Sequence, residues 1–251
     1  MKRMGIVIFA ALGAMMLLAP AALAQEEPTQ VIFGIYYRCT QGTESRADEI
    51  VRSTFGPILQ KHVDAGHMTG WLWLAHAQGG AWRRVLASVG TDLGVMMDTR
   101  DAIVEELQTA HGEAAAELAT VCGSHDDYIW NSIATSAPDP GDVAAATLST
   151  YYACDMSREG RTNEIFREVL APLYEKHREL GHLSTWGFYG HRMGGIFRRL
   201  ETFSGADHKT LLNMQAAIYE EASDNAPLAM NEFRQICSWH SDYMWNNATN
   251  P

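Results

Sequence analysis

The sequence contains one long segment twice, and this internal repeat limits the possible folds more than any other feature. A shift of 115 residues aligns residues 36–131 with residues 151–246 without a gap, and 33 of the 96 aligned pairs are identical. We refer to these segments as the first copy and the second copy. Such similarity indicates a duplication. Each copy has the size of a small domain, so we expect two similar units and not a solenoid of short repeats.

The segment before the first copy has the features of a signal peptide. Two basic residues at positions 2 and 3 precede an apolar run over residues 6–19, and an Ala-Leu-Ala sequence ends at Ala24. An uncleaved membrane anchor is the alternative, but the run is shorter than the roughly 20 residues that span a bilayer. We therefore expect a signal peptide over residues 1–24, cleaved after Ala24. The mature protein would be periplasmic or secreted and would not contact the membrane.

The composition is that of an acidic globular protein. The 251 residues are 47% hydrophobic, which is enough for a buried core, and 19 basic residues stand against 30 acidic ones, giving a net charge of −11. We therefore expect no nucleic acid partner. The sequence also lacks a P-loop, a G-x-G-x-x-G fingerprint, an H-E-x-x-H motif and a G-x-S-x-G elbow. Nucleotide-dependent enzymes, zinc proteases and α/β-hydrolases are disfavoured for that reason.

Both copies predict the same order of elements, βαββαβ. Strands are expected where β-branched and aromatic residues concentrate, and the first helix of each copy should end at a C′ glycine, Gly66 or Gly181. Pro57 and Pro172 fall inside these helices and should kink or split them. The predicted strands are 31–39, 70–76, 82–89, 125–131, 148–154, 185–191, 197–203 and 240–246. The predicted helices are 45–65, 92–120, 161–180 and 207–235.

This order is the split βαβ arrangement of ferredoxin-like domains, and two such units in one chain resemble the dimeric α+β barrel superfamily. The resemblance implies an α+β protein whose tandem ferredoxin-like repeats pack as an intramolecular two-sheet barrel. The expected parts are a first repeat at 28–134, a linker at 135–146 and a second repeat at 147–248. The superfamily includes small antibiotic-type monooxygenases, haem-degrading enzymes, chlorite dismutase-like proteins and muconolactone isomerases. Because the fused repeats take the place of a dimer, we expect a monomer.

The four cysteines are expected to form two disulfides. The first and last strands of each repeat are antiparallel neighbours in this topology, which brings Cys39 near Cys122 and Cys154 near Cys237. An even number of cysteines in an exported protein favours oxidised pairs. Four buried free thiols are the alternative. A cysteine metal site is less favoured, because no C-x-x-C spacing occurs.

The topology also gathers polar residues at the edge of each sheet where two strands end and two begin. Side chains of a strand point alternately to its two faces. On the last strand, His125 and Asp127 therefore share one face and Tyr128 and Trp130 share the other, and the second copy repeats this pattern. The candidate catalytic residues are the His-x-Asp pairs, His125, Asp127, His240 and Asp242. The candidate ligand-binding residues are His76, Arg83, Asn131, His191, Arg198 and Asn246.

Two interpretations of these polar residues remain open. They could line a pocket inside the barrel, where an imidazole and a carboxylate about 7 Å apart along a strand hold a ligand or transfer a proton. They could equally form a buried hydrogen-bond network that both copies need for folding. Histidine with aspartate also suits Zn, Fe or Cu. The number of ligands then depends on whether the polar edges of the two copies meet.

The sequence therefore supports two hypotheses of function. The first is an exported protein that binds a small apolar or aromatic ligand between its two sheets, as the aromatic content of both copies indicates. The second is an oxygenase or isomerase that works without a cofactor marked by a sequence motif. In it, His125 or His240 is the general base, oriented by the aspartate two residues later. Haem is a special case of the second hypothesis, because several members of the superfamily use it. The residues themselves assign no cofactor.

Overall fold

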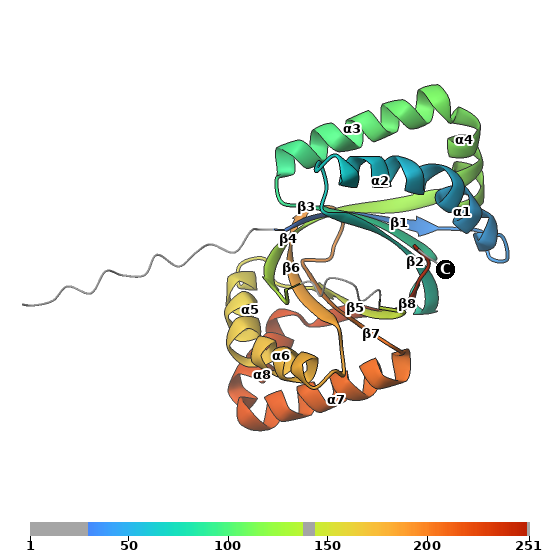
Figure 1. The fold of residues 1–251 in the computed structure, drawn as a ribbon. Helices are drawn as coiled ribbons and strands as arrows, with labels where there is room; N and C mark the ends of the chain where they lie inside the picture. Colours follow the sequence, from blue (N-terminus) through green and yellow to red (C-terminus); the bar gives the residue numbers. More distant parts are fainter. Residues whose placement is uncertain (1–29, 138–143, 250–251) are drawn as a thin grey trace, which may run out of the picture.

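A computed structural model describes residues 30–137 and 144–249, in which eight antiparallel strands close into a barrel (Figure 1). The predicted signal peptide and residues 138–143 of the predicted linker lie outside the described residues. Around the barrel the strands follow the order β1-β3-β2-β8-β5-β7-β6-β4. The strands are β1 (Val31–Arg38), β2 (Gly70–Gly79), β3 (Arg84–Gly90), β4 (Ser124–Thr135), β5 (Ala146–Ala153), β6 (Thr185–Met193), β7 (Arg199–Gly205) and β8 (Trp239–Asn247).

Helices cover the barrel on two sides. Figure 1 shows α1 to α4 on one side and α5 to α8 on the opposite side, and the order of elements in the first copy recurs in the second. The first group comprises α1 (Glu44–Ile50), the π-helix η1 (Val51–Phe55), α2 (Gly56–Asp64), α3 (Leu93–Ala110) and α4 (Gly112–Val121). The second comprises α5 (Glu159–Ile165), the π-helix η2 (Phe166–Leu170), α6 (Ala171–Glu179), α7 (His208–Asn225) and α8 (Pro227–Ile236).

Local sequence explains where the helices change course. Pro57 lies in the first turn of α2, directly after the π-helical turn η1, because proline has no N–H to continue the α-helical bonding. Gly66 ends this helix with a φ of 75°, as the sequence predicts. The single helix predicted over residues 92–120 is wrong. The structure has two helices here, separated at His111 before Gly112. In the second copy the equivalent break precedes Pro227.

Pairing between the copies closes the barrel. β2 pairs with β8 and β4 pairs with β6, both antiparallel, so one continuous barrel forms where the sequence predicted two sheets face to face. Since neighbours alternate in direction around the barrel, β1, β2, β5 and β6 all run the same way. The polar edges of the two copies therefore meet at one end of the barrel, which we call the histidine end.

Aromatic side chains fill the barrel interior. Trp130 and Trp245 have no exposed surface, and Trp82 stacks on Tyr243 with ring centroids 5.0 Å apart. An eight-stranded barrel has an interior just wide enough for side chains, so the predicted ligand site between the sheets is occupied by the protein itself. The interior cluster consists of Tyr36, Leu74, Trp82, Val85, Tyr128, Trp130, Tyr151, Tyr189, Phe197, Leu200, Tyr243 and Trp245.

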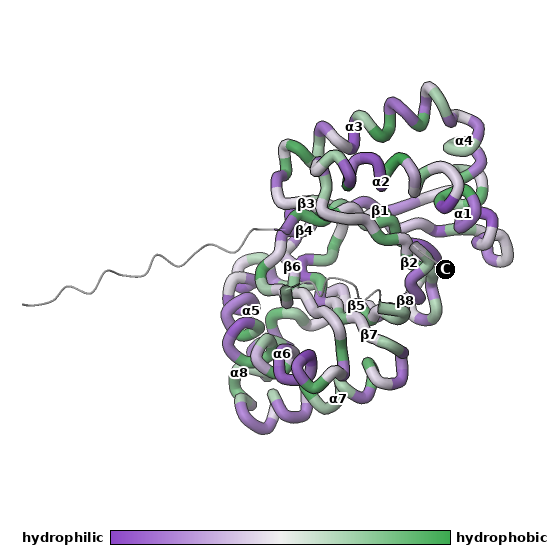
Figure 2. Tube along the Cα trace, in the orientation of Figure 1, coloured by the Kyte–Doolittle hydropathy of each residue, from purple (hydrophilic) through white to green (hydrophobic). Residues whose placement is uncertain are grey.

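Two further cores lie between the outer surface of the barrel and the helices, one for each copy. Figure 2 shows hydrophobic positions alternating with hydrophilic ones along these helices, the pattern of helices that cover a sheet with one face. Both predicted disulfides are present, Cys39–Cys122 and Cys154–Cys237. Oxidised pairs are compatible with an extracellular or periplasmic protein. In the described part of the chain, no helix has the length and apolar character needed to cross a membrane.

Candidate functional site

The candidate base His125 lies outside the barrel and faces the helices. On β4, His125, Asp127 and Ile129 line the space beneath the helices, while Tyr128 and Trp130 point into the barrel. The alternation predicted from the sequence is present, but the prediction of a polar pocket inside the barrel is wrong. The bulky aromatic face fills the narrow interior, and the polar face is left to the outer surface that the helices cover.

Each copy contains a histidine held by an aspartate. His125 Nδ1 lies 2.8 Å from Asp127 Oδ1, and His240 Nδ1 lies 3.0 Å from Asp242 Oδ2. The carboxylate accepts a hydrogen bond from Nδ1–H, which leaves Nε2 of a neutral imidazole with a free lone pair. About half of the His125 side chain is exposed. This pair is therefore arranged as an oriented base at an accessible position.

The other two predicted histidines each connect one copy to the other. We call the histidine, its arginine and glutamate, and the two aromatic rings that it contacts a lock. His76 Nδ1 accepts a hydrogen bond from Arg83 at 2.8 Å, because a guanidinium can only donate, and Arg83 also pairs with Glu44. The imidazole packs in T-shaped contacts with Tyr243 and Trp245 from the other copy, with ring centroids 6.4 and 6.1 Å apart. The equivalent lock joins His191 and Arg198 to Glu159, Tyr128 and Trp130.

This lock favours the hydrogen-bond network interpretation for His76 and its partners. Nε2 of His76 is buried and has no hydrogen-bond partner within the described residues, and the T-shaped rings offer it only a weak N–H···π contact. Burial lowers the pKa of His76, and the nearby Arg83 lowers it further. His191 has its pKa lowered in the same way. Both rings are thus held neutral at the histidine end.

The two candidate asparagines are not part of a shared site. Asn246 Oδ1 accepts a hydrogen bond from His208 Nε2 at 2.9 Å, and Asn131 pairs with Val31 at the edge of the β1–β4 ladder. Neither residue lines either of the two cavities described below. The histidine, arginine and asparagine candidates that the sequence grouped together are therefore divided between the histidine end and the outer surface of the barrel.

The first copy contains an apolar cavity of about 460 Å³ between the outer face of β1, β3 and β4 and the helices α2 and α3. His125 and Asp127 form part of its wall, and Tyr37, Ser88, Arg100 and Tyr128 are the other residues of its lining that carry a polar group. Pockets of this size and character commonly bind small molecules. The apolar lining comes from Phe33, Ile35, Phe55, Leu59, Met68, Leu86, Met96, Met97, Ile103, Val104, Leu107, Ile129 and Met193.

Part of the same space is filled in the second copy. Phe203 stands where the first copy has Ser88, and Tyr174 stands where it has Leu59. The rings of Phe203 and Tyr174 lie 5.5 Å apart, and both are almost completely buried. The second copy has instead a smaller cavity of about 340 Å³, with Thr150, Tyr152, Gln215, Tyr219, His240 and Asp242 among its lining. Despite their shared sequence, the two copies therefore present different cavities.

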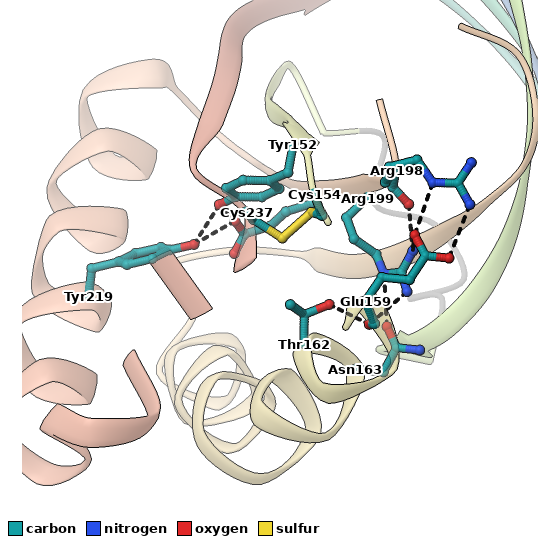
Figure 3. Close-up of a disulfide and its surroundings, with 10 residues drawn as sticks. Tyr152, Cys154, Glu159, Thr162, Asn163, Arg198, Arg199, Tyr219 and Cys237 are labelled. Atoms are coloured by element: carbon teal, nitrogen blue, oxygen red, sulfur yellow. Dashed lines mark hydrogen bonds and ion pairs between the residues drawn. A yellow bond between two sulfur atoms is a disulfide. The ribbon is translucent and has the colours of Figure 1, made fainter. Parts of the chain in front are cut away.

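A buried carboxylate marks the second copy. Glu201, with 1% of its surface exposed, accepts hydrogen bonds from Tyr152, Tyr174 and Tyr219. Burial raises the pKa of Glu201, and the three phenol donors oppose that rise. Figure 3 shows Tyr219 reaching from its helix to Tyr152 beside the Cys154–Cys237 disulfide. Sequence analysis missed this cluster, although the aligned copies differ at this position, where the first has Leu86.

Tyr37 in the first copy lacks these partners. Leu86 and Val104 stand where the second copy has Glu201 and Tyr219, and Tyr37 forms no side-chain hydrogen bond with any described residue. Its ring lines the first cavity, 5.6 Å from the ring of His125. Burial raises the pKa of Tyr37, and the negative charge of Asp127 raises it further. Tyr37 is thus a neutral hydroxyl available to a ligand.

A metal centre is not formed by the described residues. Within residues 30–137 and 144–249, no three His, Cys, Asp or Glu side chains lie close enough together to hold a metal ion. The polar edges of the two copies do meet at the histidine end, which was the condition for a shared site. However, Arg83 and Arg198 already occupy the Nδ1 atoms of the two histidines there.

Known structures share this fold at very low sequence identity. No protein family and no curated protein sequence matches the chain. A proposed monooxygenase from Fusobacterium nucleatum superposes with a TM-score of 0.61 at 9% identity, covering 88% of this chain and 93% of that one. An anthrone oxidase-like protein gives 0.55 at 10% identity, covering 89% and 94%. A chlorite dismutase variant from Candidatus Nitrospira defluvii gives 0.51 at 7% identity, covering 89% and 93%.

These similarities establish the class of fold. These structures share the overall fold of this chain, and the mixed α+β class predicted from the sequence is confirmed by the described strands and helices. At such low identity the similarity carries no residue roles. Function must be argued from the cavities of this chain.

Proposed function

We propose that the cavity of the first copy binds a small, mostly apolar aromatic molecule and that His125 removes a proton from it. The cavity itself carries this proposal, since its apolar walls enclose about 460 Å³ and a few polar groups converge on it. This proposal replaces a site between two sheets with a site between sheet and helices. The second copy, where Phe203 and Tyr174 fill part of the equivalent space, does not take part.

The arrangement suits abstraction of a proton from carbon next to a carbonyl group. His125, oriented by Asp127 through a 2.8 Å hydrogen bond, serves as the base. Tyr37 and Arg100 line the same cavity and would donate to the oxygen on which negative charge develops. The resulting carbanion can be protonated elsewhere, which is isomerisation. It can also react with dioxygen, converting CH₂ and O₂ into C=O and H₂O, which is cofactor-free oxygenation.

Haem remains a special case of this proposal. His125 is held through Nδ1 by the Asp127 carboxylate, as is typical of a metal-ligating histidine, and Arg100 would pair with one propionate. Bound haem would supply redox chemistry at its iron, and His125 would then be a ligand and not a base.

Among proteins with this fold, one is described as anthrone oxidase-like. An anthrone is a tricyclic ketone, a type of molecule that an apolar cavity of this volume favours.

Filling the first cavity is expected to abolish ligand binding while the protein stays folded. Ser88→Phe introduces the residue that the second copy has at this position, and the added ring occupies the space a ligand would take. We expect anthraquinone to quench tryptophan fluorescence in the wild type and not in Ser88→Phe, whose melting temperature should be equal or higher. Phe203→Leu serves as the control in the other copy. Equal binding by Ser88→Phe and wild type would refute the proposed site.

Loss of the base is expected to stop turnover without stopping binding. With anthrone as substrate, His125→Ala should reduce oxygen uptake and anthraquinone formation by at least about 100-fold, the usual contribution of a general base. Anthraquinone should still bind, and His208→Ala, which lies outside the lining of this cavity, should behave as wild type. A comparable loss in His240→Ala would move the base to the second copy. A haem Soret band that disappears in His125→Ala would instead make this residue an iron ligand.

We also propose a biological setting for this activity. A chain with two disulfides, preceded by a segment with signal-peptide features, would work in the periplasm or outside the cell. Duplication followed by fusion of ferredoxin-like units would explain both the repeated sequence and the repeated order of elements. Pairing of β2 with β8 and of β4 with β6 closes the barrel within one chain. A monomer that binds a small molecule and no nucleic acid fits these features.

A further inference from the structure

Three strands of the second copy present a row of polar residues to the helices. In the ladders of β5, Thr150 is paired with Glu201 on β7 and with Asp242 on β8. Directly paired residues on one face have Cβ atoms about 4.5 to 5.5 Å apart, so the hydroxyl stands between two carboxyl groups. The equivalent row in the first copy is Leu86, Ile35 and Asp127. Two apolar residues of the first copy are thus replaced by polar ones.

Thr150 lacks a partner for its hydroxyl. It exposes only 2% of its surface, and Oγ1 is buried with no hydrogen-bond partner among the described residues. An unsatisfied buried hydroxyl costs about 1 to 3 kcal/mol, so such a group usually indicates a bound molecule or water. Thr150 lines the cavity of about 340 Å³ in the second copy. The missing partner would therefore sit in that cavity.

The surrounding groups favour a positively charged partner. Asp242 lines the cavity with half of its side chain exposed. Tyr152 and Tyr219 also line it, and their hydroxyl groups form hydrogen-bond contacts with each other and with Glu201 behind the wall. A phenol oxygen can also accept a hydrogen bond, so these groups offer acceptors to a ligand. Figure 3 shows these two phenol groups converging next to the disulfide.

Comparison of the cavities strengthens this inference. The cationic Arg100 of the first cavity corresponds to the neutral Gln215 of the second, and Leu86 corresponds to the acidic Glu201. The first change removes a positive charge from the cavity, and the second places hydrogen-bonding groups behind its wall. One cation, Arg234, also lines it, and its guanidinium is directed to Ser223. Aromatic faces next to carboxylates are a common way to hold an ammonium group.

We propose that the cavity of the second copy is a binding site for a small organic ammonium ion, with Thr150, Tyr152, Tyr219 and Asp242 as its contacts. Ammonium N–H groups would donate to the threonine and phenol oxygens and to the Asp242 carboxylate. A metal ion is not the expected ligand, because the described residues contain no cluster of three metal-ligating side chains. This site is separate from the proposed aromatic site, so either can fail without the other.

Calorimetric titration of benzylammonium chloride into the full-length Ser88→Phe protein tests the proposal. This variant has its first cavity filled, so that binding reports on the second. At pH 7 we expect benzylammonium to bind at least about tenfold more tightly than neutral benzyl alcohol of similar shape. Asp242→Asn should weaken binding about tenfold, as for the loss of one hydrogen bond to a charged group. Thr150→Val, which keeps the side-chain shape on the strand, should weaken it severalfold.

A matched control and two contrary outcomes make the test decisive. Asp127→Asn alters the equivalent carboxylate of the first copy and should leave benzylammonium affinity unchanged. Equal affinity for benzyl alcohol and benzylammonium would overturn the proposal, as would unchanged affinity in both Asp242→Asn and Thr150→Val. Circular dichroism of each variant establishes that the fold is retained. The isosteric Thr150→Val keeps the test valid even if Asp242→Asn unfolds.

Discussion

Replacing Cys39 and Cys122 together by alanine is expected to lower the free energy of unfolding by about 4 to 5 kcal/mol. This disulfide links two residues that are 83 apart in the sequence. In the chain-entropy model, removing a disulfide that closes a loop of this length lowers the free energy of unfolding by that amount. Domains of ordinary stability have only about 5 to 15 kcal/mol in total. The variant should therefore lie close to the limit of folding. Denaturant unfolding, followed by tryptophan fluorescence, measures the change.

The second disulfide provides an internal control for this prediction. Cys154 and Cys237 have the same separation of 83 residues, so their replacement by alanine should have a similar effect. Removing both pairs should leave little folded protein at room temperature, and wild type in strong reductant should approach that state. A loss below about 1 kcal/mol for either pair would contradict the loop-closure explanation. It would mean that the reduced, unfolded chain is already compact.

The disulfides were predictable because they follow from strand order alone. The pairing of Cys39 with Cys122 needs only the knowledge that the first and last strands of a copy are neighbours, and β1 does pair with β4. Helix boundaries depend on similarly local chemistry. Gly66 needs a positive φ, and the Asp92 side chain accepts a hydrogen bond from the backbone of Val95, as a capping residue should.

The orientation of the sheet was not predictable in the same way. The alternation of side chains places Tyr128 and Trp130 on one face of the strand and His125 and Asp127 on the other. It does not determine which face points into the barrel. That choice depends on closure of the barrel through pairs such as β2 with β8, which join residues far apart in sequence. Once the barrel closes, its narrow interior takes the aromatic rings, and the polar face turns to the helices.

The candidate site depends on positions at which the two copies differ. Searching for a repeat directs attention to identical residues, and most identical pairs serve the shared fold, as His76 and His191 do in their locks. The cavity arises from the absence of volume at Ser88, and its loss in the second copy from the presence of Phe203. A comparison of side-chain sizes at unequal positions would have found it.

Phe203→Ser is expected to lower the free energy of unfolding by about 3 to 5 kcal/mol. Phe203 is 1% exposed and packs against Tyr174 between the barrel and its helices. Removing a buried phenyl ring forfeits its transfer free energy and leaves a cavity that the surrounding core closes only in part. Phe203→Leu, which retains most of the volume, should cost clearly less. Thermal and denaturant unfolding of the two variants, compared with wild type, test the difference.

The reverse substitution makes the comparison informative about function. If packing alone governed both copies, Ser88→Phe should stabilise the protein by about 0.5 to 2 kcal/mol, as cavity filling commonly does. A chain that keeps serine at this position forgoes that stability, and such losses are typical of binding sites. The free energy of unfolding could instead be unchanged in Phe203→Ser, or strongly lowered in Ser88→Phe. Either result would mean that the first cavity is not an open space able to accept a phenyl ring. In that case the asymmetry between the copies would no longer support a ligand site.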